Sequence, residues 1–195
     1  MYIRLTRSAL AVPGGQNLSA GVMIMNTKRL VRCAMVAALY TVLCLALIPF
    51  SYGAIQVRLA EILCLLPVFG AEYIVAVTLG CFLSNLLGST MVDVLFGTVA
   101  TLLACLVTYQ LRNFRIGSAK LAIPSALPPI LFNALIVGAL ELTFFIPDAA
   151  ATLPAALWNA FTVGLGEVIS CGILGVLLVY FIEKNPAVRR LFADN

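Results

Sequence analysis

Runs of apolar residues divide this chain and restrict the folds that are open to it. Five runs are plain, and they extend over Leu30 to Pro49, Tyr73 to Leu87, Val92 to Leu111, Leu121 to Ile146 and Ala155 to Ile182. About 20 apolar residues let a helix cross a hydrocarbon core of roughly 30 Å. Only 10% of the residues are charged and 63% are hydrophobic, with a mean hydropathy of +1.09. We therefore predict an all-α integral membrane protein.

A sixth apolar segment, Val57 to Phe69, is short. As an α-helix it would reach about 20 Å, which is less than one span. Basic residues decide whether it crosses, because they accumulate on the cytoplasmic side of a membrane. They form three clusters, which are Lys28, Arg29 and Arg32; Arg112, Arg115 and Lys120; and Lys184, Arg189 and Arg190. All three basic clusters lie on the same side of the membrane only if the short segment crosses it. We expect six transmembrane helices with a short second helix, both termini in the cytoplasm, and a loop over Ser51 to Val57 that dips into the membrane.

The remaining segments flank this membrane domain, which is predicted over residues 27–184. Residues 1–26 carry no signature of a secretory signal. They are predicted to be an unstructured extension or the product of a misplaced start, because "MNTKRLVR" from Met25 would make a normal amino terminus. Residues 185–195 are predicted to be a cytoplasmic tail.

The cysteines do not indicate a metal site. Six of them are scattered singly through apolar segments, and the chain has no CxxC motif and no histidine. We interpret them as small hydrophobic residues and predict neither a metal nor a cofactor. The basic residues lie at the ends of apolar runs, so we also predict no nucleic-acid partner.

Polar side chains recur in the outer half of the predicted bundle, with a few placed deeper. A charge at the centre of a spanning helix costs roughly 2.5 to 3.5 kcal/mol, so such residues usually serve a function. One alternative is structural: Arg58 pairs with Glu61, the other acids sit among lipid headgroups, and Trp158 joins an aromatic belt. The other is an outward-facing pocket for a ligand with several N–H donors and a carbonyl. The predicted ligand-binding residues are Gln56, Arg58, Glu61, Asn85, Asp93, Asn133, Glu141, Trp158, Asn159 and Glu167.

The chain lacks the motifs that would let it use ATP or catalyse hydrolysis. No P-loop, GxSxG or HExxH pattern occurs, so uphill transport would need an ion gradient or a partner ATPase. We predict no catalytic residue. Small residues at Ala34, Ala37 and Ala38 would let another helix approach closely, either a partner subunit or a neighbour within the bundle.

Several stretches resemble the QueT family, substrate-binding S components of energy-coupling factor transporters. The likeness covers about Thr27 to Glu183 and rests on Ala34 and Ala38, "IQVRLAEILCLLPVF", "LGCFLSNLLGSTMVDVLFGTVATLLA" and "VGLGE". It implies a six-helix bundle in the bacterial plasma membrane that captures a queuosine precursor, a 7-deazaguanine base, from outside. It also implies assembly with a membrane T component and two ATP-binding subunits. The family pattern points to Gln56, Arg58, Glu61, Asn85, Asp93 and Glu167, whereas Asn133, Glu141 and Asn159 follow from position alone.

Other functions fit the sequence as well. The chain could be an S component for another small vitamin-like solute, or an ion-coupled carrier that acts alone. A third alternative is an intramembrane enzyme that uses Glu61 and Glu167 as acid and base. An enzyme would turn over its substrate, whereas a binding subunit would bind tightly without turnover.

Overall fold

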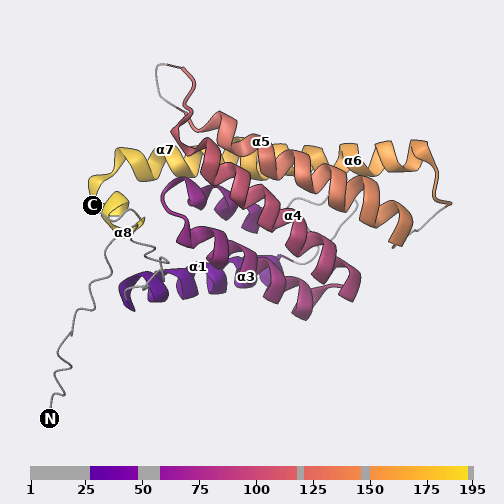
Figure 1. The fold of residues 1–195 in the computed structure, drawn as a ribbon, viewed down its shortest axis with the longest axis horizontal. Helices are drawn as coiled ribbons and strands as arrows, with labels where there is room; N and C mark the ends of the chain where they lie inside the picture. Colours follow the sequence, from indigo (N-terminus) through magenta and orange to yellow (C-terminus); the bar gives the residue numbers. More distant parts are fainter. Residues whose placement is uncertain (1–26, 48–57, 118–120, 146–149, 193–195) are drawn as a thin grey trace, which may run out of the picture.

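The computed structural model describes residues 27–47, 58–117, 121–145 and 150–192. The predicted extension over residues 1–26 and the loop with Gln56 lie outside these ranges. Within them the chain is helical: α1 (Thr27–Ala46), η1 (Leu59–Val68), α3 (Glu72–Gly88), α4 (Met91–Gln110), η2 (Leu111–Asn113), α5 (Ile123–Phe132), η3 (Asn133–Phe145), α6 (Leu153–Glu167), η4 (Val168–Gly175), α7 (Val176–Lys184) and α8 (Pro186–Phe192) (Figure 1). The described ranges contain no strand, and their single β-bridge joins Ile116 to Leu121. The predicted all-α class is confirmed.

Every predicted apolar run lies on a helix. Four helices are long and apolar enough to cross a membrane: Thr27–Ala46, Met91–Asn113, Ile123–Phe145 and Leu153–Lys184. Two apolar helices, Leu59–Val68 and Glu72–Gly88, are shorter. Large apolar side chains are exposed around the bundle, among them Met35, Leu87, Leu127, Phe161 and Leu177. A lipid environment accounts for this surface, since soluble proteins rarely expose such extensive apolar patches. The chain is thus a multi-pass membrane protein.

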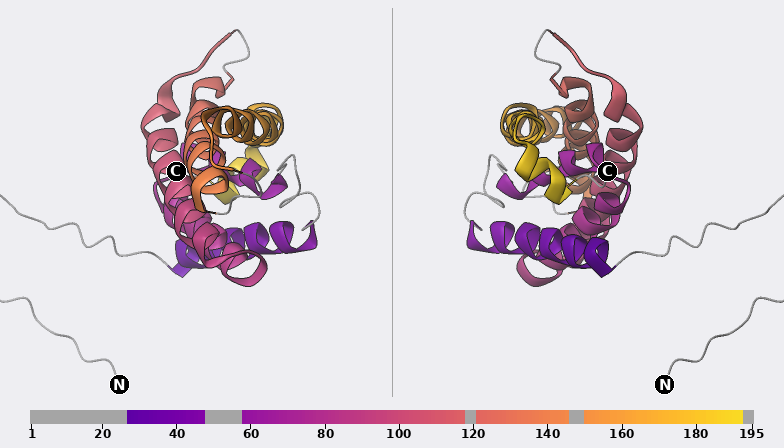
Figure 2. Two further views of the ribbon diagram at one scale, coloured as in Figure 1. Left: turned by 90° about the vertical axis from the view of Figure 1, so that its right-hand side faces the viewer. Right: turned by 90° about the vertical axis from the view of Figure 1, so that its left-hand side faces the viewer.

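The short helix η1 lies inside the bundle. It packs against α1, α3, α4, α5, η4 and α7, and the end views place α1 and the long Leu153–Lys184 helix on opposite sides of the molecule (Figure 2). Its ten residues, LAEILCLLPV, are apolar except for Glu61, as expected for a helix that is buried on all sides. The winding is 3-10, which rises about 2.0 Å per residue and gives a length of about 20 Å.

Prolines explain a change of winding in the fifth apolar run. Pro128 and Pro129 lie inside α5, and a proline has no N–H to donate to the carbonyl four residues earlier. For Pro129 that carbonyl belongs to Ser125, and it accepts a hydrogen bond from Thr108 Oγ1 of α4 at 2.9 Å instead. After the prolines the helix continues as the π-helix η3, a rare winding that is frequent at functional sites.

The two faces of α1 have different environments. Ala34 and Ala38 are exposed, so the alternative in which they pack within the bundle is not the arrangement found. Ala37 is only 4% exposed and faces α3, where a Cβ added to Gly80 would lie 2.9 Å from the Ala37 carbonyl oxygen. Ala37 is thus packed against α3, and its contribution to a partner interface stays a prediction. Adjacent residues of an α-helix point about 100° apart, which separates Ala37 from Ala38.

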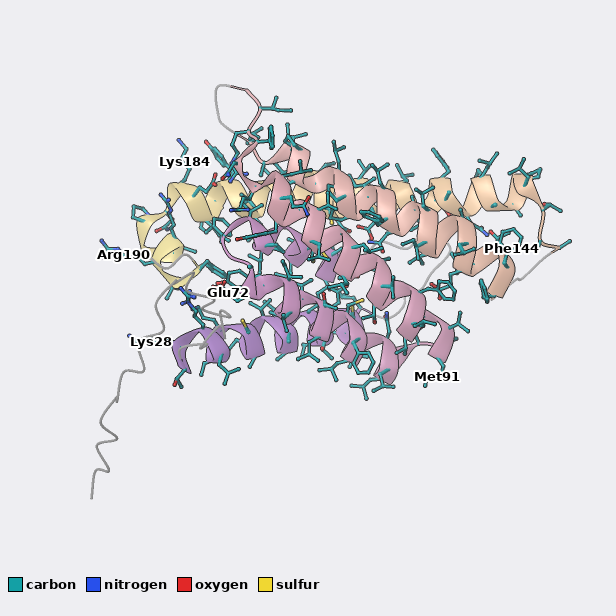
Figure 3. All side chains as sticks on the ribbon, viewed as in Figure 1. Lys28, Glu72, Met91, Phe144, Lys184 and Arg190 are labelled. Atoms are coloured by element: carbon teal, nitrogen blue, oxygen red, sulfur yellow. The ribbon has the colours of Figure 1, made fainter. Side chains whose placement is uncertain are left out.

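The carboxyl-terminal segment forms a contact layer at one end of the bundle. Tyr73 Oη donates to the Phe192 carbonyl at 2.9 Å, and Arg32 Nη1 donates to the Leu191 carbonyl at 3.0 Å. Nearby, Arg115 and Glu183 form a salt bridge of 2.8 Å. Figure 3 shows Lys28, Glu72, Lys184 and Arg190 at this end and Met91 and Phe144 far from it. Part of the predicted tail is therefore the helix α8, packed against the ends of α1 and α3.

Glycines allow two pairs of helices to approach closely. A Cβ on Gly80 would lie 2.7 Å from Tyr40 Cβ, and one on Gly138 would lie 2.8 Å from both Ala160 Cα and the Asn159 carbonyl oxygen. The Gly138 clash involves backbone atoms of α6, which cannot move without shifting the helix. Gly138 thus fixes the spacing between η3 and α6.

Gly138→Ala is expected to destabilise the protein by about 1 to 3 kcal/mol, because the added methyl group overpacks this helix contact. The matched control is Gly172→Ala, where the nearest atom to a new Cβ is at 3.5 Å. That control should be neutral or slightly stabilising. Thermal unfolding in detergent micelles measures both variants. Equal effects of the two substitutions would contradict the close contact at Gly138.

Candidate ligand-binding site

Arg58, Asn85 and Asp93 form one buried polar group from three elements. Arg58 precedes η1 with an extended backbone, and its Nη2 atom lies 3.2 and 3.1 Å from Oδ1 and Oδ2 of Asp93 on α4. Asn85 Nδ2, on α3, donates to the Asp93 main-chain carbonyl at 3.1 Å. None of the three residues is more than 5% exposed. Their charges are tolerated in an apolar interior because they neutralise each other.

The start of α4 holds Asp93 in place. Thr90 is the N-cap, and its Oγ1 accepts a hydrogen bond from the Asp93 amide at 3.2 Å. A carboxylate in the first turn is also favoured by the helix dipole. One turn further on, Gly97 leaves room for the group, since a Cβ there would lie 2.7 Å from Asn85 Nδ2 and 2.8 Å from Asp93 Oδ1.

Glu61 has partners other than Arg58. Its Oε1 accepts a hydrogen bond from Tyr40 Oη at 2.5 Å, and its Oε2 accepts one from Cys64 Sγ at 2.6 Å. Glu61, Tyr40 and Cys64 are all fully buried. The alternative in which Glu61 neutralises Arg58 is therefore not the arrangement found. The Glu61 amide donates to the Arg58 carbonyl at 2.9 Å, so the two residues are one turn apart, but their side chains bond to different partners.

Glu167 lies next to the Glu61 group. Cys171 Sγ donates to Glu167 Oε2 at 3.3 Å and contacts the Glu61 main-chain carbonyl at 3.0 Å. Ligand atoms of Glu61, Glu167 and Cys171 lie within 4.8 Å of one another, a spacing that could hold an ion. Both carboxylate oxygens of Glu61 already accept one hydrogen bond each, and the thiol of Cys171 donates to Glu167, so protein donors satisfy the cluster without an ion. We assign no metal to this cluster.

Two further predicted site residues, Asn133 and Glu141, lie on η3. They are 3% and 1% exposed. Asn133 interacts with Glu167, and Glu141 interacts electrostatically with Asp93 and Arg58. The interior thus contains a polar region made of two groups, one around Arg58 and Asp93 and one around Glu61 and Glu167, and the first group interacts electrostatically with Glu141 and with the second group.

Trp158 and Asn159 do not join this region through any hydrogen bond found in the described ranges. Trp158 is 65% exposed and packs against Phe161, with ring centroids 6.0 Å apart. The rotation of α6 therefore directs Trp158 outward, and its assignment to the ligand site stays a prediction. Asn159 is half-buried, and its Nδ2 donates to Thr143 Oγ1 at 3.0 Å, which links α6 to η3. Gln56 lies outside the described residues.

Several residues that shape the region were not predicted from the sequence. Tyr40, Cys64 and Cys171 supply hydrogen-bond donors to buried carboxylates, and Gly97 supplies space. A tyrosine in an apolar helix is a signal in principle, since a buried phenol usually needs a polar partner. The cysteines were correctly expected to be buried, but their role as donors has no signal in their spacing.

Comparison with known proteins gives a consistent result. A family model described as QueT transporter matches residues 30–184. A curated relative, the "Queuosine precursor transporter QueT" of Lactococcus lactis subsp. cremoris (strain MG1363), is 46% identical over 79 residues, which is 40% of this chain and 47% of the relative. The match thus spans about half the length of that relative. No solved structure matches the chain.

Removing one partner of the Arg58–Asp93 ion pair is expected to lower the free energy of unfolding by more than the intact pair adds to it. Arg58→Met or Asp93→Asn leaves a buried charge uncompensated, which should destabilise the protein by about 3 to 5 kcal/mol. The double variant should lose less than the sum of the two single losses, by roughly 0.5 to 3 kcal/mol. Unfolding in detergent measures all three variants, and additive losses would refute the coupling.

Proposed function

Because the chain belongs to the QueT transporter family, we propose that it is the substrate-binding S component of an energy-coupling factor importer. Its ligand in this proposal is a queuosine precursor, a 7-deazaguanine base captured from outside the cell. The relative from Lactococcus lactis carries the name of a queuosine precursor transporter, which supports this choice of ligand. The chain itself binds the solute and performs no chemical conversion.

The proposal depends on one observation: this chain belongs to a transporter family, and its membrane bundle contains a buried polar region. Its side chains are rich in carboxylates and amides, since Glu141, Glu167 and Asn133 are buried in the same bundle as the Arg58–Asp93 pair. A guanine-like edge offers N–H donors at the ring nitrogen and the exocyclic amine, and a carbonyl acceptor. Carboxylates and amides are the groups that complement such an edge. We propose Gln56, Arg58, Glu61, Asn85, Asp93 and Asn159 as further members of the site.

The proposed topology has six spans with both termini in the cytoplasm of a bacterial cell. The membrane domain is residues 27–184, with an extension before it and a tail after it. The contacts of Arg32 with Leu191 and of Arg115 with Glu183 support this topology, because they join all three basic clusters at one end of the bundle. Basic residues at one end are expected on the cytoplasmic side.

The energy for uptake comes, in this proposal, from partner proteins. The sequence has no P-loop, so a T component and two ATP-binding subunits would supply ATP hydrolysis. Ala34 and Ala38 on the exposed face of α1 support a contact with the T component, since small residues at i and i+4 let a second helix approach closely.

Purified protein in detergent is expected to bind 7-deazaguanine saturably and without turnover, as followed by isothermal titration calorimetry and chromatography of the recovered ligand. Thiamine, riboflavin and biotin serve as competitors that should not displace it. Saturable binding of a vitamin alone would indicate an S component for another solute. Conversion of the ligand would instead favour the carboxylate enzyme.

Replacing Ala34 or Ala38 with leucine should abolish ATP-driven uptake, because the larger side chain blocks the approach of the partner helix. Ligand affinity should stay within about twofold, because the interior of the bundle is unchanged. Ala46→Leu is the matched control, since Ala46 is exposed at the other end of α1. Uptake in cells with and without the T component and ATP-binding subunits measures the effect. Accumulation driven by an ion gradient without those subunits would support a stand-alone carrier and refute this assignment.

A further inference from the structure

Two polar side-chain atoms in the candidate site are buried and incompletely hydrogen-bonded. Oε2 of Glu141 finds no partner among the described residues, and Nδ2 of Asn133 makes no hydrogen bond of good geometry there, although the Asn133 amide interacts with the Glu167 carboxylate. Both residues are at least 97% buried, with exposures of 1% and 3%. Leaving such atoms unpaired is unfavourable, so an unpaired acceptor and an unpaired donor in one site indicate positions that a bound molecule completes.

Other polar residues of the region are already engaged. Both oxygens of the Asp93 carboxylate lie within hydrogen-bond distance of Arg58, and both oxygens of Glu61 accept from Tyr40 and Cys64. Every oxygen of these two carboxylates thus has a protein donor, whereas Oε2 of Glu141 has none among the described residues. These contacts make Arg58, Asp93 and Glu61 positioning residues, which fix the shape and charge of the interior.

The two incompletely bonded residues share one helical element. Asn133 begins η3 and Glu141 lies eight positions later on the same π-helix, with the buried Val137 between them. Because π-helical winding is rare and is concentrated at functional sites, it is an observation independent of the missing partners. η3 packs against α4, which carries Asp93, and against α6, which carries Glu167 at its end.

We propose that Glu141 and Asn133 are the residues of this site that contact the ligand directly and determine its specificity. Glu141 accepts hydrogen bonds from the ring N–H and exocyclic amine of the 7-deazaguanine base, and Asn133 donates to an acceptor atom of the ligand. This assignment rests on the proposed function, because it takes the ligand class from it. Asp93 and Arg58 interact with Glu141 electrostatically but form an ion pair with each other, which leaves the carboxylate of Glu141 for the ligand.

The test compares 7-deazaguanine with 7-deazahypoxanthine, which lacks the exocyclic amine, by titration calorimetry on the purified full chain. Wild-type protein should prefer 7-deazaguanine by about tenfold, since the hydrogen bond from the exocyclic amine to the buried Glu141 side chain is lost with the amine. Glu141→Gln should reduce this preference to about twofold or less, because the amide replaces one acceptor with a competing donor. Asn133→Leu should weaken both ligands by about the same factor and leave their ratio unchanged.

Matched controls lie at the other end of the bundle. Glu183→Gln, at the salt bridge with Arg115, and Asn113→Leu, at an exposed position of η2, should leave both affinities unchanged. Size-exclusion chromatography and thermal unfolding identify any variant that fails to fold. If Glu141→Gln does so, Glu141→Asp replaces it, because a carboxylate shortened by one methylene should also reduce the preference.

The outcomes separate the two proposals. If wild-type protein binds neither base, the proposed function is refuted together with its ligand contacts. If wild-type protein binds 7-deazaguanine and folded Glu141 variants keep the full preference for the amine, the assignment of Glu141 is overturned and the proposed function stands. An unchanged affinity of Asn133→Leu for both bases would overturn the assignment of Asn133 in the same way.

Discussion

Polar groups inside this bundle must find partners within the chain or in a bound molecule, because hydrocarbon supplies none. The position of η1 inside the bundle provides most of these partners. Arg58 stands at its start and Glu61 in its first turn, and packing among the surrounding helices brings Asp93, Tyr40 and Cys171 to them. If η1 lay at the periphery, these side chains would face lipid with their charges unpaired. The surrounding helices are arranged around this interior segment.

Hydrophobicity and charge predicted the helices and the burial of Arg58, Glu61, Asn85, Asp93, Asn133, Glu141 and Glu167, because both properties vary along the chain on the scale of a helix. Neither property predicts which side chains of two different helices meet. Asp93 lies 35 residues from Arg58 and Tyr40 lies 21 residues from Glu61, so each pair depends on how two helices rotate. The outward direction of Trp158 depends on helix rotation in the same way. Winding was a second obstacle, since the 3-10 and π geometries of η1 and η3 change the angle between successive side chains.

Pro128 and Pro129 interrupt the main-chain hydrogen bonds of α5, and a contact with α4 compensates for the interruption. Their sequence positions indicate that the helix is disturbed, but not which neighbour compensates. Thr108, on α4, satisfies the Ser125 carbonyl, which ties α5 to α4 at the point where the ladder of main-chain hydrogen bonds is broken. Beyond that point the chain continues as η3, which holds Asn133 and Glu141 in the interior. The prolines, the threonine and the π-helix therefore form one continuous structural unit that carries the proposed ligand contacts.

The helix α8 brings the end of the described chain back to the start of α1. Arg32 and Tyr73 hold it through the Leu191 and Phe192 carbonyls, which are main-chain atoms, so substitutions of the Leu191 and Phe192 side chains leave these acceptors in place. A fluorophore attached at Arg190 would sit beside α1, the helix proposed to meet the T component. Such a probe would report the approach of that subunit from a position outside the ligand site, and it would separate assembly from substrate capture in time.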